Sequence, residues 1–435
     1  MSGWIPPDRS FFYGYIIRWL SVSTDSLTSL LIFQCFLGAM TAIFVSVICR
    51  SIFALSFNVS CLFGVLCALD PLQLLWERYL MTEAISLFFY VTMLLLSFIY
   101  LKERRLWQLA LIQVVGVLAI SLRISYLLLV QAQAVLLPLI AFFPEIRATV
   151  QGCLAGKINI SILKAAAIHL IIGLSLMLLL HSSYKYLNGR LSHRKPSYLY
   201  VTGLNLLAMW APALESADSP DPRLATLIAE GNQFGIRDPG ARGIQLYRAG
   251  YLVNRWRHIE TNPAIADKLG KQTAMHALFR QPSGVLMLGL DTFFGYWHID
   301  QMRRQAKYEL GNIPLPDQLR SNLGRFFHYV PAPKTAKREF SILQRYFLRA
   351  QPYYNLVVLA PLFCAILLFL LPNRYATLLL IHSSILLGTS VLFTVTATVR
   401  YLQPLSLLLI LTAAAFLNWM SRPRDRLLFT KPGKV

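Results

Sequence analysis

Ionisable side chains are scarce in this chain. Only 14% of its 435 residues are Asp, Glu, Lys or Arg, whereas 56% are hydrophobic. An ordinary soluble domain is roughly one quarter charged. The apolar residues stand in long uncharged runs, so the composition excludes a typical soluble globular protein and predicts a polytopic membrane protein.

Acidic residues are the scarcer of the two charge types. The 20 Asp and Glu residues compare with 41 Lys and Arg, which gives a formal net charge of +21. In a membrane protein such an excess reflects topology and contact with anionic lipid. The chain also has no RNA-binding aromatic signature and no zinc-finger spacing, so we expect no nucleic-acid partner.

Several chemical motifs are missing. The six cysteines form no C-x-x-C pair and are expected to be small buried hydrophobes. The eight histidines show no ligand spacing, so we predict no metal site, and His169 and His382 are expected to be hydrogen-bonded core residues. No Walker or Rossmann glycine pattern points to a nucleotide cofactor. The acidic pair in Asp218-Ser-Pro-Asp221 is similar to a metal motif of nucleotide-sugar enzymes, but its proline-rich setting favours a loop.

The fold class predicted from the apolar runs is an all-α polytopic membrane protein with nine or ten transmembrane helices. A helix needs roughly 20 apolar residues to cross hydrocarbon. The runs cover residues 27–49, 52–69, 84–101, 106–143, 160–181, 354–371, 375–396 and 401–420.

Two of these assignments have alternatives. The run 106–143 is broken around Arg123, which predicts two helices that meet there; the alternative is one long tilted helix with a snorkelling arginine. Residues 197–214 are weakly apolar and either cross the membrane or lie on its surface. Two helices meeting at Arg123 require the surface placement, which we therefore prefer.

Charge asymmetry predicts the topology and the domains. The basic loop at residues 102–105 and the basic tail should be cytoplasmic, which places the segment between residues 215 and 352 outside. The predicted organisation is an N-terminal transmembrane module with outer loops (1–214), an outer α-rich soluble domain (215–352), a three-helix transmembrane module (353–420) and a cytoplasmic tail (421–435). In the outer domain, Asn262-Pro263 should cap a helix that ends at Gln281-Pro282 and carries an apolar stripe through Ile265, Leu269, Ala274, Leu278 and Phe279.

The outer face is predicted to collect charged residues from distant parts of the chain. Charges so close to hydrocarbon are usually functional or paired. Arginine presents a planar fork of donors that suits phosphate oxygens, and a carboxylate can take a proton from an attacking hydroxyl. A lipid phosphate leaves as a stable anion and needs cationic stabilisation. The set therefore favours glycosyl transfer from a lipid-phosphate sugar, while the alternative is that each arginine only anchors its helix. Its members are Asp8, Arg9, Asp70, Glu77, Arg78, Glu83, Arg123 and Arg400.

Three short motifs resemble those of the GT-C glycosyltransferase superfamily, in its protein O-mannosyltransferase and aminoarabinose transferase-like branches. Glu77-Arg78-Tyr-Leu-Met-Thr-Glu83 is similar to the family's E-R-x-hydrophobic-x-[ST]-E stretch, and Arg400-Tyr401-x-x-Pro404 to its R-Y-x-x-P. The segment that begins Asp8-Arg9-Ser resembles the end of the first outer loop, with Gln34 at the usual glutamine of the next helix.

The resemblance implies an inverting transferase that uses a polyprenyl-phosphate sugar as donor and has no nucleotide donor. Expected partners are membrane lipid, the donor, and a glycan, lipid or protein acceptor; a divalent cation is a possible cofactor. Asp8 is the expected general base, although the family's base follows a first helix and no such helix precedes Asp8 here. Glu83 would orient Arg78 or bind acceptor or metal, and Asp70 and Glu77 would support the site. The residues expected to hold the lipid phosphate are Arg9, Arg78, Arg123, Arg400 and Tyr401.

The alternative function is a lipid-linked glycan transporter or a non-catalytic partner of a membrane glycosylation complex. A transporter is expected to show related halves with charged residues near mid-membrane. Here the charges stand at the ends of the apolar runs and the halves look unlike, which favours the enzyme.

Overall fold

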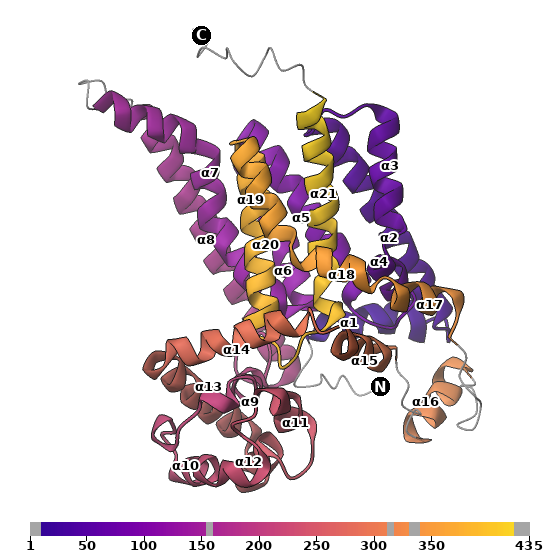
Figure 1. Cartoon of the computed structure of the whole chain (residues 1–435), viewed down its shortest axis with the longest axis vertical. Coiled ribbons are helices and arrows are strands. Elements are labelled where there is room, and N and C mark those ends of the chain that lie inside the picture. Colours follow the sequence, from indigo (N-terminus) through magenta and orange to yellow (C-terminus); the bar gives the residue numbers. More distant parts are fainter. Residues whose placement is uncertain (1–9, 154–159, 311–316, 330–339, 422–435) are drawn as a thin grey trace.

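The chain folds into a helical bundle with a smaller lobe at one end (Figure 1). The computed structural model describes residues 10–153, 160–310, 317–329 and 340–421, and in these ranges it contains helices and no strands. Six of the helices described are long and apolar enough to cross a membrane. They are α2 (Thr28–Ser51), α5 (Glu83–Glu103), η2 with α7 (Ile124–Thr149 of a helix that ends at Cys153), α8 (Ile160–Ser192), α20 (Arg374–Leu392) and η7 with α21 (Val399–Met420).

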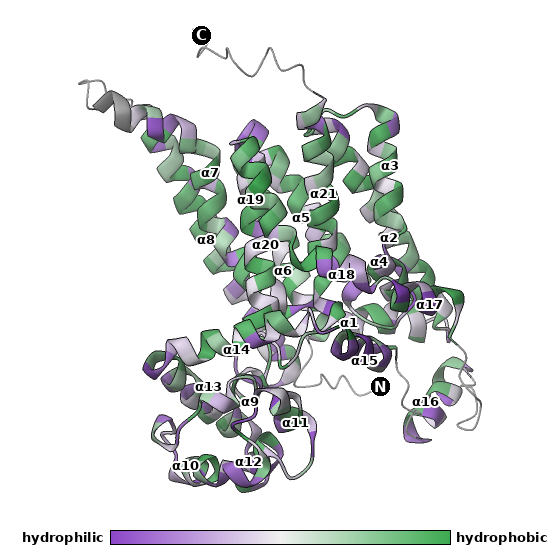
Figure 2. Cartoon of the chain, in the orientation of Figure 1, coloured by the Kyte–Doolittle hydropathy of each residue, from purple (hydrophilic) through white to green (hydrophobic). Residues whose placement is uncertain are grey.

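Shorter apolar helices complete the bundle. They are α3 (Phe57–Ala68), α6 (Leu106–Leu122), and the pair α18 (Gln351–Val358) and α19 (Ala360–Leu370), which meet at 51°. Pro361, in the first turn of α19, cannot donate to the preceding helix, so the predicted run 354–371 is bent rather than straight. By length and composition the described residues thus contain six candidate spans, or seven if the bent pair is one span, against the predicted nine or ten. Figure 2 shows that the bundle is apolar along much of its length.

Two helices meet at Arg123, as predicted. Helix α6 ends at Leu122, and Arg123 has extended backbone angles (φ −149°, ψ 107°) before the chain continues into η2 (Ile124–Tyr126) and α7. At the other end of α6, the connection to α5 is two residues long, with Arg104 in the left-handed conformation (φ 57°).

The histidines in the bundle are hydrogen-bonded core residues, as predicted. His382 is fully buried, and its ring nitrogens lie 3.2 Å from the Tyr90 hydroxyl and 2.8 Å from the Gln133 amide. The Nδ1 atom of His169 lies 2.9 Å from the Tyr100 hydroxyl. Polar groups inside an apolar bundle are stable when they are paired in this way.

The lobe has its own hydrophobic core, and that core begins before residue 215. Leu204 and Leu207 of α9 (Thr202–Met209) pack with residues such as Leu224 and Trp256. The predicted boundary between residues 214 and 215 therefore falls inside this core. Residues 197–214 do not form a spanning helix. The remaining helices of the lobe are α10 (Pro222–Ala229), α11 (Arg242–Tyr247), α12 (Leu252–Ile259), α13 (Pro263–Arg280) and α14 (Pro282–Gly295).

Helix α13 begins and ends where predicted, but its buried face differs from the prediction. The Asn262 side chain accepts hydrogen bonds from the backbone of Ala264 and Ile265, and the helix ends at Arg280. Ile265 and Phe279 of the predicted stripe are exposed. The face packed inside consists of small residues, because α9 crosses at close range: Ala266, Gly270, Thr273, Ala274 and Ala277.

The end of the predicted outer domain is not part of the lobe's core. Helices α15 (Ile299–Glu309) and α17 (Ile342–Arg349) pack against elements at the end of the bundle, including α4 (Pro71–Trp76) and α18. Helix α16 (Asp317–Phe327) follows α15. The short N-terminal helix α1 (Phe11–Ile17) and the following η1 (Arg18–Val22) also lie at this end, and Phe12 packs against a cluster that includes Leu30 and Leu122.

We predict that Gly203→Ala destabilises the lobe. A Cβ atom at Gly203 would overlap the backbone oxygen of Asp267, whose carboxylate also accepts hydrogen bonds from Gly203 and Leu204. Overpacking of this kind costs about 1–3 kcal/mol. Gly243→Ala in α11 is the matched control, since its nearest neighbour would be 3.7 Å away. Thermal unfolding and limited proteolysis of the purified protein measure the effect, and equal behaviour of the two variants would contradict the packing described.

Candidate functional site

Three charged residues from distant helices meet at the lobe end of the bundle. Glu83 is the first residue of α5, Arg123 connects α6 to η2, and Arg400 lies in η7 (Val399–Leu402) at the start of α21. Glu83 is fully buried and forms an ion pair with the Arg400 Nε atom. Arg123, which is 7% exposed, donates from Nη2 to the backbone oxygen of Arg400 at 2.8 Å.

Arg123 has unused hydrogen-bonding capacity in this cluster. Its guanidinium lies over the Tyr401 ring, 4.8 Å from the ring centroid. Its Nε and Nη1 atoms are buried and make no hydrogen bond of good geometry to a described residue, although the Tyr126 side chain lies near the guanidinium. The Glu83 Oε2 atom likewise has no partner among the described residues. Buried polar atoms are nearly always paired, because an unpaired one costs about 1–3 kcal/mol. The arrangement therefore marks a place where an additional polar group can bind.

A fourth charged residue, Glu309, joins the cluster from α15. Thr398 donates to its Oε1 atom, and its buried Oε2 atom has no partner among the described residues. Two tyrosines hold the surrounding backbone: Tyr79 donates to the Leu310 oxygen at 3.3 Å, and Tyr296 donates to the Thr398 oxygen at 3.2 Å.

The sequence pattern did not identify Glu309 as a site residue, because it lies in an ordinary amphipathic segment. Burial raises its pKa to about 8, and the nearby Glu83 charge acts in the same direction, although Arg400 and Arg123 oppose the rise. Glu309 is therefore mostly protonated at pH 7.

The charges of the cluster suit a singly charged anion. With Arg400 paired to Glu83 and Glu309 protonated, the positive charge of Arg123 is left without a carboxylate partner. The Arg400 side chain is 27% exposed, so the cluster reaches the molecular surface. Two guanidinium groups beside a protonated carboxyl offer several donors to the oxygens of a phosphodiester.

Asp70 and Glu77 lie in a different environment, where neighbouring residues donate hydrogen bonds to them. Asp70 caps α4 by accepting from Leu72 (2.8 Å) and Gln73 (3.1 Å), and it also accepts from Tyr353 and Ser406. A small cavity adjoins Asp70; its lining residues include Cys67, Gln403 and Ser406. Asp70 thus connects α4, α18 and α21.

Glu77 and Gln34 hold the loop that follows α4. Glu77 accepts from the Gln73 amide at 2.6 Å, and burial raises its pKa to about 7. The amide of Gln34 donates to the backbone oxygens of Trp76, Glu77 and Tyr79. These contacts support the loop between α4 and Glu83.

The remaining predicted site residues are not part of the cluster. Arg78 is exposed, and the partner of Glu83 is Arg400 rather than Arg78. Asp8 and Arg9 lie outside the described residues.

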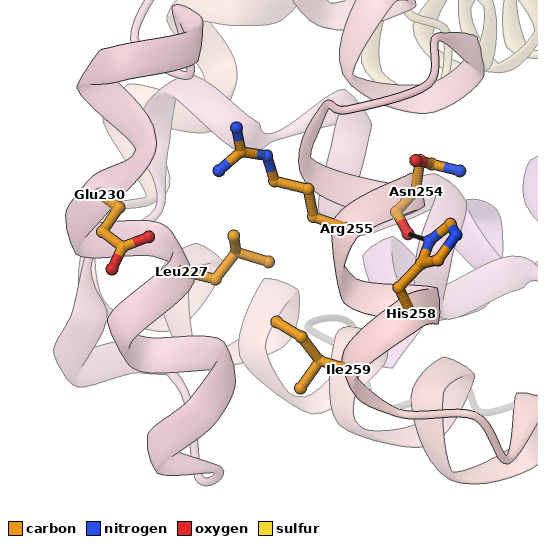
Figure 3. A pocket seen from close by; sticks show the side chains of 6 residues that line it. All are labelled: Leu227, Glu230, Asn254, Arg255, His258 and Ile259. Carbon is orange, nitrogen blue, oxygen red and sulfur yellow. Dashed lines mark hydrogen bonds between the residues drawn. The ribbon is translucent and has the colours of Figure 1, made fainter.

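A larger hollow lies on the lobe, between α10 and α12 (Figure 3). Its volume is about 390 Å³, and it opens to solvent. Two of its polar side chains are engaged by the backbone: Arg255 donates to the Gly250 oxygen at 2.6 Å, and the His258 Nδ1 atom lies 2.7 Å from the Asn254 backbone oxygen. We therefore prefer the cluster of Glu83, Arg123, Arg400 and Glu309 as the candidate site.

The fold and the cluster define a class: an all-helical chain whose six long apolar helices indicate a membrane protein, with a buried cationic site at one end of the bundle. In the part of the chain that the structure describes, no three His, Cys, Asp or Glu residues are grouped to hold a metal ion. Comparisons of the chain with protein-family models, with curated proteins and with solved structures found no match.

We predict that anion binding weakens as the pH rises through about 8. Below this pH Glu309 is neutral; above it, Glu309 ionises and adds a negative charge beside Arg123 and Arg400. A unit charge at this range changes the affinity by roughly tenfold, about 1.4 kcal/mol. An isoprenyl sulfate is a suitable probe, because its own charge stays constant between pH 6 and pH 9.5.

Glu309→Gln is the control for this pH effect. It keeps the side chain neutral and nearly unchanged in shape, so its affinity should stay level across the range. Calorimetry or fluorescence titration of the two proteins measures the difference. A wild-type affinity independent of pH would show that Glu309 does not face the bound anion.

Proposed function

We propose that the chain is a membrane-embedded glycosyltransferase of the GT-C type, which moves a sugar from a polyprenyl-phosphate donor to a hydroxyl of a glycan, lipid or protein. The observation that carries the proposal is Arg123: a buried guanidinium with two unpaired nitrogens beside Arg400. A site of this kind at the end of an apolar bundle can hold a phosphate whose hydrocarbon chain runs along the helices. The resemblance of Glu77–Glu83 and Arg400–Pro404 to family motifs agrees with it.

The proposed reaction is an inverting displacement. The acceptor oxygen attacks the sugar's anomeric carbon from the face opposite the phosphate, a new C–O bond forms, and the bond to the phosphate oxygen breaks. The lipid phosphate leaves with the bonding electrons and a second negative charge, which Arg123 and Arg400 stabilise. A carboxylate takes the acceptor's proton; Asp8 is the proposed base.

Glu83 serves as a positioning residue in this scheme. Its ion pair orients the Arg400 guanidinium, and the Arg400 backbone oxygen in turn holds Arg123. Tyr401 covers the other side of the Arg123 guanidinium and limits its movement. Preorganised cations of this type stabilise charge that develops in the transition state without further rearrangement.

The proposed setting is the plasma or inner membrane with nine or ten spans, the shorter apolar helices included. The site, the lobe and α15 to α17 would face the outer side, and the basic tail the cytoplasm, because positive loops are retained inside. Labelling of a cysteine introduced at Ile259, an exposed position on the lobe, tests in intact cells on which side of the membrane the lobe lies.

The activity itself is tested by incubating the purified protein with a radiolabelled polyprenyl-phosphate sugar and a panel of acceptors. Transfer to an acceptor supports the enzyme. Binding of the donor without transfer would instead support a non-catalytic partner, and movement of the donor across vesicle membranes would support a transporter. A protein that neither binds nor transfers any donor would overturn the proposal.

We predict that Arg123→Met and Arg400→Ala each lower transfer by about 100-fold or more, as losses of charge-stabilising donors do. Arg78→Ala should keep transfer within about threefold, since Arg78 is exposed and outside the cluster. All three are compared at equal membrane expression and with size-exclusion profiles. Transfer at wild-type rates by Arg400→Ala would remove that residue from the site.

A further inference from the structure

Helix α14 is apolar on two faces. Its sequence, Pro-Ser-Gly-Val-Leu-Met-Leu-Gly-Leu-Asp-Thr-Phe-Phe-Gly, has a single charged residue. A helix that is hydrophobic all round is expected to be covered all round. The described structure covers only one of the two faces.

The covered face packs against the end of α20. Gly289 lies against Leu392, close enough that an added Cβ atom would be 2.6 Å from that side chain. The Trp210 indole, from the segment after α9, donates to the Leu392 oxygen at 3.1 Å and packs beside Phe393. These contacts fix α14 at the level where a membrane-length helix ends.

The uncovered face consists of Leu286, Met287, Leu290 and Phe294, which are between 47% and 62% exposed. At 100° per residue they occupy an arc of about 100° on the helix. The only charged group on α14, Asp291, is paired with Arg242 of α11. An apolar strip of this length is unusual on a surface that faces water.

The position of α14 indicates what covers the strip. Its axis lies across the bundle, directly beneath the ends of the long helices, whereas α10 and α12 lie on the far side of the lobe (Figure 1). Figure 2 shows α14 as an apolar band between the bundle and the more polar lobe. Phe393, at the end of α20, is exposed as well, so both α14 and the helix it packs against present apolar side chains at this level.

Aromatic and basic residues at the same end fit a lipid surface. Trp297 follows α14, and Trp19 and Tyr15 of the N-terminal segment are exposed as well. Such rings concentrate at the headgroup level of membranes. Exposed basic residues on the next helix, α15, can contact anionic headgroups: Arg303, Arg304 and Lys307.

We propose that α14 lies in the bilayer interface, with Leu286, Met287, Leu290 and Phe294 in the lipid, and that it docks the lobe onto the membrane beside the cationic cluster. The helix is parallel to the surface and buries one apolar face among headgroups and acyl chains. This inference does not depend on the proposed glycosyl transfer, since it follows from the exposure and position of α14 and from the apolar helices beside it.

Site-specific photo-crosslinking tests the assignment. p-Benzoylphenylalanine is placed at Leu290, and in a separate protein at Ile259 on α12, which is 41% exposed on the far side of the lobe. Both are exposed positions, so neither substitution disturbs the core. The full-length proteins are reconstituted in nanodiscs of phosphatidylglycerol and phosphatidylcholine, irradiated, and analysed by mass spectrometry for lipid adducts.

Lipid adducts at residue 290 should exceed those at residue 259 several-fold. Equal yields at the two positions would overturn the proposal. The same irradiation in native membranes distinguishes the other possible occupants: adducts at residue 290 to a second copy of the chain, or to another protein, in place of lipid would also overturn it. Size-exclusion profiles matching the wild type confirm that each labelled protein is folded.

Discussion

The ion pair of Glu83 with Arg400 is the contact on which this end of the bundle depends. A fully buried carboxylate is stable only with a charged partner, and removal of one partner from such a pair costs about 3–5 kcal/mol. The pair joins residues 317 positions apart in the chain, and the Arg400 backbone oxygen then holds Arg123 between α6 and η2. One electrostatic contact thus determines where α5, the junction of α6 and α7, and α21 meet.

The carboxylates near this contact differ in whether their oxygens already have hydrogen-bond partners. Asp70 caps a helix and accepts two hydroxyl donors, so it ties helices together and has little capacity for a ligand. Glu309 and Glu83 each keep one buried oxygen without a partner in the described structure, and Arg123 keeps two nitrogens. Saturated groups stabilise the fold, whereas the atoms of Arg123, Glu83 and Glu309 without partners can still accept or donate a hydrogen bond.

Sequence reasoning located most of the cluster, because Glu83, Arg123 and Arg400 each interrupt or border an apolar run, where a charge is conspicuous. Glu309 could not be found in this way, since charged residues are ordinary in its amphipathic helix and its partner Thr398 lies 89 positions away. The start of the lobe was also missed, because the apolar side chains of α9 pack against α10 to α13, and a short apolar run does not reveal its partner. The helical class and the junction at Arg123 follow from patterns within single runs and were predicted.

The length of α8 determines how the lobe is joined to the bundle. Its 33 residues extend about 50 Å, while the hydrocarbon core of a bilayer is about 30 Å thick. Helix α8 is therefore longer than the hydrocarbon core is thick. It leads into the segment that precedes α9, and Asn188 in its last turns donates to the backbone oxygens of Ser197 and Tyr198. Few residues along the apolar length of α8 are buried against the rest of the chain, so the lobe is joined to a helix that lipid, more than protein, would surround.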